Sequence, residues 1–160
     1  MDISSSIFLL SLKTLILAAT LGALIGIERE WAQRGAGLRT FSLISLGAAL
    51  FVMISRLSFI QYLGISSLDP SRTLGQIIVG MGFLGAGIII FKQREGRVEG
   101  LTTAAMMWAT AAVGAAVGLE LYWLAISTTI LIVLINFVVL PFEKRLEEKI
   151  EKIKNGGKEE

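Results

Sequence analysis

The chain has 160 residues, of which 54% are hydrophobic and 18% are charged, and its mean hydropathy is +0.72. A soluble domain is about 45–50% apolar and about 25% charged, so this composition predicts a membrane protein. The net charge of +2 gives no basis for nucleic-acid binding, and the absence of histidine and cysteine excludes disulfides, thiolate nucleophiles, imidazole bases and the usual zinc sites. We therefore expect no enzymatic activity, no catalytic residue and no cofactor; magnesium, a hard cation bound by oxygen atoms, is a candidate ligand.

Five apolar stretches are long enough to cross a bilayer, because a transmembrane helix needs roughly 20 mainly apolar residues. The fourth and fifth are separated by little more than Glu120, so they must form a tight hairpin unless one of them is tilted or short. The first lacks the positively charged start of a signal peptide, so we expect it to be retained. The sequence predicts an all-α, polytopic membrane bundle over residues 1–140, with about five transmembrane helices at residues 7–27, 41–60, 74–91, 101–119 and 121–140.

Basic residues predict the orientation of this bundle, because short cytoplasmic loops are enriched in lysine and arginine. Twelve of the 15 lysines and arginines lie in the first and third loops and in the C-terminal segment 141–160. We therefore expect the N-terminus outside and the C-terminus in the cytoplasm. Segment 141–160 is charged, with apolar residues at helical spacing up to about residue 154. It is either a cytoplasmic extension of the fifth span or a helix that binds a membrane surface or a partner.

The end of the first span carries charges at the membrane boundary. Glu28 and Glu30 lie at a helix C-terminus, where carboxylates are unfavourable unless a cation such as Arg29 or Arg39 meets them. The start of the fourth span lies on the same predicted side. We expect a cytoplasmic polar cluster that binds an ion, a ligand or a partner, made of Glu28, Arg29, Arg39, Thr40, Thr102 and Thr103. The alternatives are an ordinary interfacial charge belt and, for Thr102, a helix cap.

The opposite side has a smaller motif at the start of the third span. Asp69 before Pro70 is typical of a helix N-terminus, with the aspartate as N-cap and the proline at the first helical position. Capping explains Asp69. The alternative is a paired role for Asp69 and Arg72 at the outer face.

Glycines recur in three of the spans. The third span has five within thirteen residues, which indicates either close helix approach, expected at Gly80 and Gly82, or a local break, expected at residues 83–87. Spans one and four carry GxxxG pairs, so we expect spans one, three and four to form the tight centre, span five to face lipid, and the protein to form a homodimer through its glycine-rich faces. The predicted packing residues are Gly22, Gly26, Gly80, Gly82, Gly85, Gly114 and Gly118.

Together these segments resemble the MgtC/SapB family of membrane proteins. The resemblance covers residues 20–118 in family order: residues 22–31, 37–40 with 46–51, 69–72, 80–87, and 100–105 with Trp108. It is specific because five such matches occur in sequence. The family positions carried onto this chain are Glu28, Arg29, Arg39, Thr40, Asp69, Arg72, Gly82, Gly85, Thr102 and Thr103.

The resemblance implies a multi-pass protein of the bacterial or archaeal inner membrane. Family members are linked to growth at low magnesium and to survival inside host cells, and some are reported to restrain other membrane proteins, including the proton-driven ATP synthase. Many carry a C-terminal soluble domain of ACT-like type, which this chain stops short of. We expect a regulator linked to magnesium homeostasis or membrane energetics that acts through contacts with other membrane proteins. The alternative is a small oligomeric ion transporter or channel, which the lack of a mid-span carboxylate disfavours.

Overall fold

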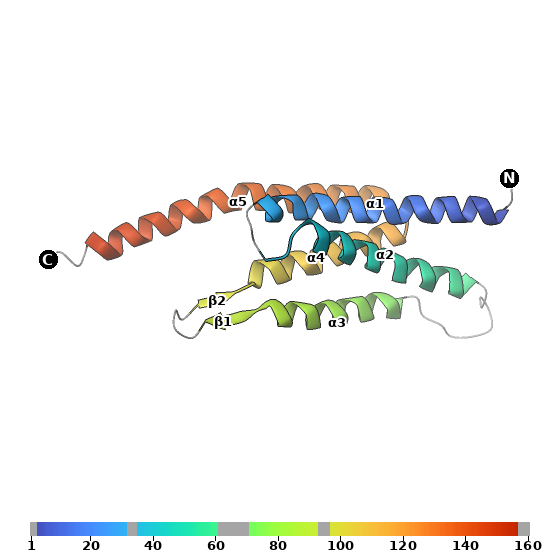
Figure 1. Ribbon diagram of the computed structural model, residues 1–160, viewed down its shortest axis with the longest axis horizontal. Helices are drawn as coiled ribbons and strands as arrows, with labels where there is room; N and C mark the ends of the chain where they lie inside the picture. Colours follow the sequence, from blue (N-terminus) through green and yellow to red (C-terminus); the bar gives the residue numbers. More distant parts are fainter. Residues whose placement is uncertain (1–2, 32–34, 61–70, 93–96, 157–160) are drawn as a thin grey trace.

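The computed structural model describes residues 3–31, 35–60, 71–92 and 97–156 (Figure 1). In these residues the chain forms five helices and one antiparallel β-hairpin, in which Ile90 pairs with Glu99 and Lys92 with Arg97. The elements in order are α1 Ile3–Trp31, α2 Leu38–Ile60, α3 Ser71–Ile88, β1 Ile90–Lys92, β2 Arg97–Glu99, α4 Leu101–Gly118 and α5 Tyr122–Gly156. The fold is all-α apart from this short hairpin.

Successive helices run in opposite directions, as Figure 1 shows. The end of α1, the start of α2, the β-hairpin and the start of α4 therefore share one end of the bundle, which we call the hairpin end. The end of α2 and the starts of α3 and α5 share the other, which we call the far end. The described basic residues of the first and third loops, Arg29, Arg39, Lys92 and Arg97, lie towards the hairpin end, the side that the sequence predicts to face the cytoplasm.

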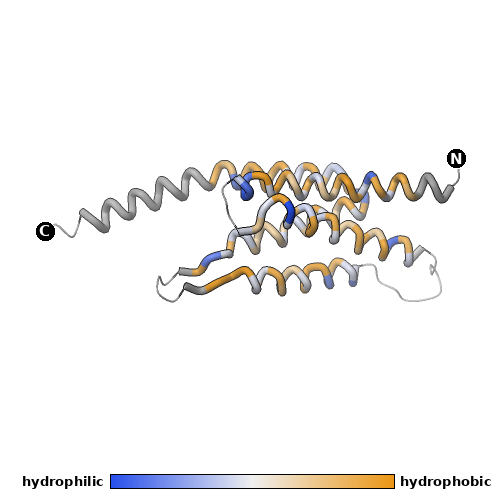
Figure 2. Tube along the Cα trace, in the orientation of Figure 1, coloured by the Kyte–Doolittle hydropathy of each residue, from blue (hydrophilic) through white to orange (hydrophobic). Residues whose placement is uncertain are grey.

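Four of the helices are long and apolar enough to cross a membrane, at residues 8–31, 38–58, 101–118 and 122–139. Apolar residues cover the described parts of these helices on their outer sides as well as inside (Figure 2). Phe51 and Trp123, for example, are 62% and 85% exposed. Such surfaces are stable only in a hydrocarbon solvent, because water would leave their apolar area unburied.

The fifth helix, α3, is not among these four, and it carries Arg72, Gln76 and several glycines. It is also shifted from the predicted span: the helix expected at residues 74–91 begins at Ser71 and ends at Ile88, and the chain then enters β1. The break expected at residues 83–87 is wrong. The amide of Ile89 still donates to the Gly85 carbonyl at 3.2 Å, so the helical hydrogen bonds continue past these glycines.

The tight centre of the bundle is α2 held between α1 and α4. A Cβ built on Gly22 would lie 2.8 Å from the Ser45 Cβ, and one on Gly26 would lie 2.7 Å from the Leu38 Cα. From the other side, a Cβ on Gly114 would overlap the Ser45 carbonyl. Glycine is therefore required at these three positions, because real Cβ atoms do not fit at such distances.

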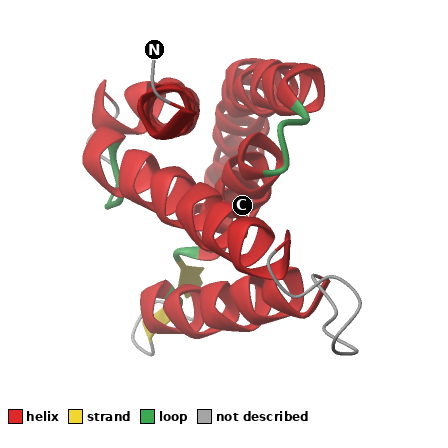
Figure 3. Ribbon diagram, turned by 90° about the vertical axis from the view of Figure 1, so that its right-hand side faces the viewer, coloured by secondary structure: helices red, strands yellow, loops and turns green. Residues whose placement is uncertain are grey.

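This arrangement corrects the prediction that the third span belongs to the centre. Both views of the bundle show α3 at its edge (Figures 1 and 3), where it packs mainly on α4 through Met81 and Gly85. The prediction was wrong because glycine content alone does not say which partner a helix face meets. The prediction for the fifth span agrees with the structure: only 11% of the α5 window is buried, against 56% for α4.

The turn between α4 and α5 is as tight as the sequence predicts. Glu120 adopts a left-handed backbone conformation with φ 65°, and its amide donates to the Val117 carbonyl at 2.9 Å. Its carboxylate pairs with Arg56 of α2 at 3.0 Å, and Arg56 also reaches the Gly118 carbonyl at 3.5 Å. This contact ties the α4–α5 turn to α2 at the far end. From Tyr122, α5 continues as one helix to Gly156, through the charged segment.

Candidate functional site

The hairpin end contains a buried guanidinium. Arg29, in the last turn of α1, is only 4% exposed, and its Nη2 donates a hydrogen bond to the Thr103 Oγ1 in the first turn of α4. Thr103 is also buried, at 6% exposed. A cation at a helix C-terminus is favoured by the helix dipole, whereas its burial is costly unless its N–H groups find acceptors. The Thr103 hydroxyl is one of these acceptors, so the pair joins α1 to α4.

Two carboxylates lie beside this pair in the sequence, and each is placed differently. Glu28 is half-buried, and its Oε2 is buried with no hydrogen-bond partner in the described part of the chain. Glu30 is exposed, and its Oε2 accepts a hydrogen bond from the Leu38 amide at 3.1 Å. Glu30 thus satisfies one of the free N–H groups that begin α2. Of the two carboxylates, Glu28 is thus the one with a buried oxygen that accepts no hydrogen bond from the described residues.

The remaining members of the predicted cluster do not join it. Arg39 is exposed and Thr40 half-buried on α2, and both line a groove between α2 and α3. Thr102 is exposed, and it does not cap its helix: the N-cap is Gly100, with φ 89° and no side-chain cap hydrogen bond. A side chain on Gly100 would also overlap the Ile88 carbonyl. The predicted site therefore divides into a buried part at Arg29 and Thr103 and a groove part at Arg39 and Thr40.

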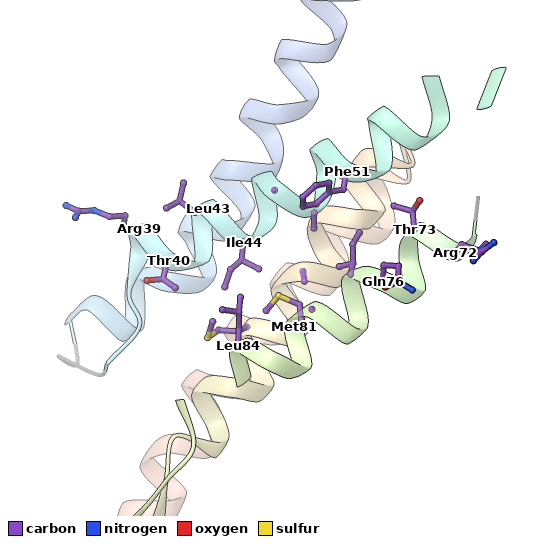
Figure 4. Close-up of a pocket in the computed structure, with 16 residues that line it drawn as sticks. Arg39, Thr40, Leu43, Ile44, Phe51, Arg72, Thr73, Gln76, Met81 and Leu84 are labelled. Atoms are coloured by element: carbon purple, nitrogen blue, oxygen red, sulfur yellow. The ribbon is translucent and has the colours of Figure 1, made fainter. Parts of the chain in front are cut away.

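The far-end motif is described only in part. Asp69 lies outside the described residues, so its expected roles stay predictions. Arg72 is exposed and lines the same groove as Arg39, at its opposite mouth (Figure 4). Next to it, the Thr73 Oγ1 donates to the Ser55 Oγ at 2.9 Å, which joins α3 to α2 at this end. Sequence reasoning did not single out Ser55, Thr73 or the groove.

The glycines divide by what surrounds them. Four of them lie against the backbone of α2: Gly22, Gly26, Gly114 and Gly118. A Cβ built on Gly85 would lie 3.4 Å from the Ala104 Cβ. Around Gly75, Gly80 and Gly82 no described atom lies within 4 Å of a built Cβ. The structure therefore does not place Gly80 and Gly82 in the close contact that the sequence predicted within this chain.

One face of α3 points away from the rest of the bundle. At helical spacing it carries Gly75, Val79, Gly82 and Ala86, all exposed. Phe83, next to this face, is 82% exposed. We call Gly75, Val79, Gly82 and Ala86 the outward face of α3. Small residues at Gly82 and Ala86, four positions apart, are the pattern that lets another membrane helix approach closely.

Among the described residues no group of three or more acidic residues is placed to hold a metal ion. Two buried threonines of the spans bond to their own helices, whereas the Ser45 Oγ in α2 is buried with no hydrogen-bond partner in the described part of the chain. Thr110 donates to the Met106 carbonyl at 2.7 Å and Thr129 to the Ala125 carbonyl at 2.9 Å. These contacts hold the helices and offer no row of ligands along the bundle.

Comparison with known proteins now identifies the family, because residues 15–145 match the MgtC family. The chain belongs to the MgtC family. It is 42% identical over 137 residues to a protein of Escherichia coli K12 named "Putative magnesium transporter YhiD", and 42% identical over 135 residues to "Protein MgtC" of Salmonella typhimurium LT2. A protein of Synechocystis, slr0014, is 42% identical over 132 residues.

These matches cover most of this chain and a smaller part of each relative. They include 84% of the chain and 63% of YhiD, 84% of the chain and 54% of MgtC, and 82% of the chain and 53% of slr0014. The chain thus spans between about half and two thirds of the length of these relatives. No solved structure matches the chain. The region that matches the MgtC family contains α2, α3 and α4 and most of α1 and α5, and the buried Arg29–Thr103 pair lies within it.

Proposed function

We propose that this MgtC-family protein is a small membrane regulator linked to magnesium homeostasis, which acts through lateral contacts with other membrane proteins. The outward face of α3 carries the proposal. Each glycine costs a helix about 1 kcal/mol relative to alanine in water, and contacts must offset this cost. Around Gly75 and Gly82 no described atom of the chain supplies such a contact. A second transmembrane helix packed on this face would supply it.

The position of α3 supports the same proposal. It lies at the edge of the bundle and packs mainly on α4, and Figure 3 shows its outer side free of other described helices. A helix that is held on one side can present the other side without any rearrangement of the central α1, α2 and α4. The partner is then a second copy of this chain, another membrane protein, or both; the family resemblance names the proton-driven ATP synthase as one candidate.

A photoreactive amino acid placed at Val79 tests this contact in cells. Val79 is 67% exposed on the outward face, and Ile135, 59% exposed on α5, is the matched position on a lipid-facing helix. We expect ultraviolet light to join position 79 to a discrete protein, seen as one or two sharp higher-mass bands, and position 135 to none. Equal band patterns at both positions would contradict the proposal, and the mass of the band separates a second copy from another protein.

The alternative is a small oligomeric transporter, which the printed name of the YhiD relative suggests for that protein. A cation path would need oxygen ligands or charges near the middle of the membrane. Thr110 and Thr129 bond to carbonyls of their own helices. The described carboxylates Glu28, Glu30 and Glu120 lie at helix ends. The regulator is therefore the function that the geometry supports better.

A further inference from the structure

A groove of about 790 Å³ runs between α2 and α3. Its walls come from these two helices, and Met107 and Ala111 of α4 form part of its floor. Figure 4 shows the two walls diverging around it, with Ile44, Met81 and Leu84 turned towards the space between them. The described hydrogen bond that joins α2 to α3 lies at the far end, between Thr73 and Ser55. The groove is separate from the outward face of α3, whose residues do not line it.

The middle of the groove is apolar. Leu43, Phe51 and Leu84 line it, and the glycines of its two walls, Gly47 and Gly80, leave room because a Cβ built on either meets no described atom within 4 Å. In a bilayer such a space is filled by hydrocarbon, since water would find almost no hydrogen-bond partner there.

Each mouth of the groove carries a cation followed by a hydroxyl: Arg39 with Thr40 at the hairpin end, and Arg72 with Thr73 at the far end. Arg39 reaches outward from the mouth in Figure 4. The nearby carboxylate of Glu30 is bound to the Leu38 amide, and among the described side chains no carboxylate forms an ion pair with Arg39. An arginine at the membrane boundary with no carboxylate partner complements a phosphate, which it can bind through two parallel hydrogen bonds.

The length of the groove suits one acyl chain. The groove follows α2 from Arg39 to Phe51, about 18 Å at a rise of about 1.5 Å per residue. That length is close to the depth of one leaflet, about half of the roughly 30 Å hydrocarbon core.

We propose that this groove binds an anionic glycerophospholipid, whose phosphate lies at Arg39 and Thr40 and whose acyl chain lies between α2 and α3. The lipid fills the space that Gly47 and Gly80 leave open. It thereby supports the α3 wall along the part that Thr73 and Ser55 do not join. This proposal does not depend on the regulatory function, because the groove and the outward face use different residues of α3.

Native mass spectrometry of the purified, delipidated chain tests the proposal, with phosphatidylglycerol or the zwitterionic phosphatidylcholine added back. We expect one phosphatidylglycerol adduct on the wild type and at least tenfold less phosphatidylcholine. Arg39→Gln and Gly80→Leu should each lower the phosphatidylglycerol adduct at least tenfold, the first by removing the phosphate partner and the second by filling the groove. Arg72→Gln should retain the adduct, because that guanidinium lies at the opposite mouth of the groove from the phosphate site at Arg39.

Gly82→Leu is the matched control for Gly80→Leu, because it adds the same side chain to the same helix outside the groove, where a built Cβ also meets no described atom. It should retain the adduct, and equal melting temperatures for the two variants show that both are folded. Retention of the adduct by Gly80→Leu would overturn the proposal. So would equal binding of the two lipids, or a wild-type dimer that Gly80→Leu converts to a monomer, since a second copy would then occupy the groove.

Discussion

Gly114→Ala is expected to destabilise the bundle far more than Gly82→Ala does. The new Cβ would overlap the Ser45 carbonyl and lie 2.7 Å from the Ser45 Cα, and these are backbone atoms of the central helix that cannot rotate away. Overpacking a tight interior costs about 1–3 kcal/mol and occasionally more. We therefore expect a clear fall in the melting temperature of the detergent-solubilised protein, measured by the loss of its monodisperse peak on heating.

Gly82→Ala is the control for this prediction. It adds the same methyl group to a membrane helix, where the built Cβ meets no described atom within 4 Å. The melting temperature should stay the same or rise, because alanine is the better helix former by about 1 kcal/mol in water. If both variants melt together with the wild type, α2 is not held between α1 and α4 as described.

Thr103→Val is expected to have the second largest effect. Valine keeps the shape of threonine and removes the hydroxyl that accepts a hydrogen bond from the buried Arg29. Leaving a buried donor with one acceptor fewer costs about 1–3 kcal/mol, and more when the donor is charged. The melting temperature should fall, and Thr103→Ser, which keeps the hydroxyl, should recover most of the loss.

The neighbouring threonine gives the control. Thr102 is exposed on the same helical turn, so Thr102→Val should leave the melting temperature unchanged. Equal losses for Thr102→Val and Thr103→Val would mean that valine disturbs the start of α4 for a reason other than the Arg29 contact. Wild-type stability of Thr103→Val would contradict a stabilising hydrogen bond between Arg29 and Thr103.

Much of the fold could be predicted from hydropathy, because lipid requires long apolar helices and leaves few alternatives. The predicted span 41–60 lies inside α2, and the span 101–119 extends one residue beyond α4. The span 121–140 begins one residue before α5 and ends inside it. The third was less accurate. Ile89, Ile90 and Phe91 continue its apolar run, but the helix ends at Ile88 and these residues lead into a strand. Hydropathy does not distinguish an apolar strand from the last turn of a helix.

The partners of the glycines were less predictable. A GxxxG pair indicates that another helix approaches, and it does not say which one. Gly22 and Gly114 both meet Ser45 of α2, a span in which the sequence analysis found no packing motif. The signal that could have found it is the run of small residues Ser45, Gly47, Ala48 and Ala49 in α2. A substitution at Gly114 therefore tests packing within one chain and not a homodimer contact.

The polar cluster was predicted from charges at one side of the membrane, and side alone does not bring side chains together. Arg29 and Thr103 meet because α1 and α4 both pack on α2. Arg39 is separated from them because its position on α2 turns it towards α3 and the groove. Rotation of each helix about its axis decides such contacts, and it follows from packing that a single sequence does not display.

The most direct test of the proposed function is growth at low magnesium of a bacterium that lacks its own MgtC-family protein and produces this chain or a variant. Gly82→Leu enlarges the outward face of α3 without meeting any described atom of the chain. We predict that the wild type and Gly82→Ala restore growth and that Gly82→Leu, present in the membrane at the same level and with the same melting temperature, does not. Full restoration of growth by Gly82→Leu would contradict a function through contacts on this face.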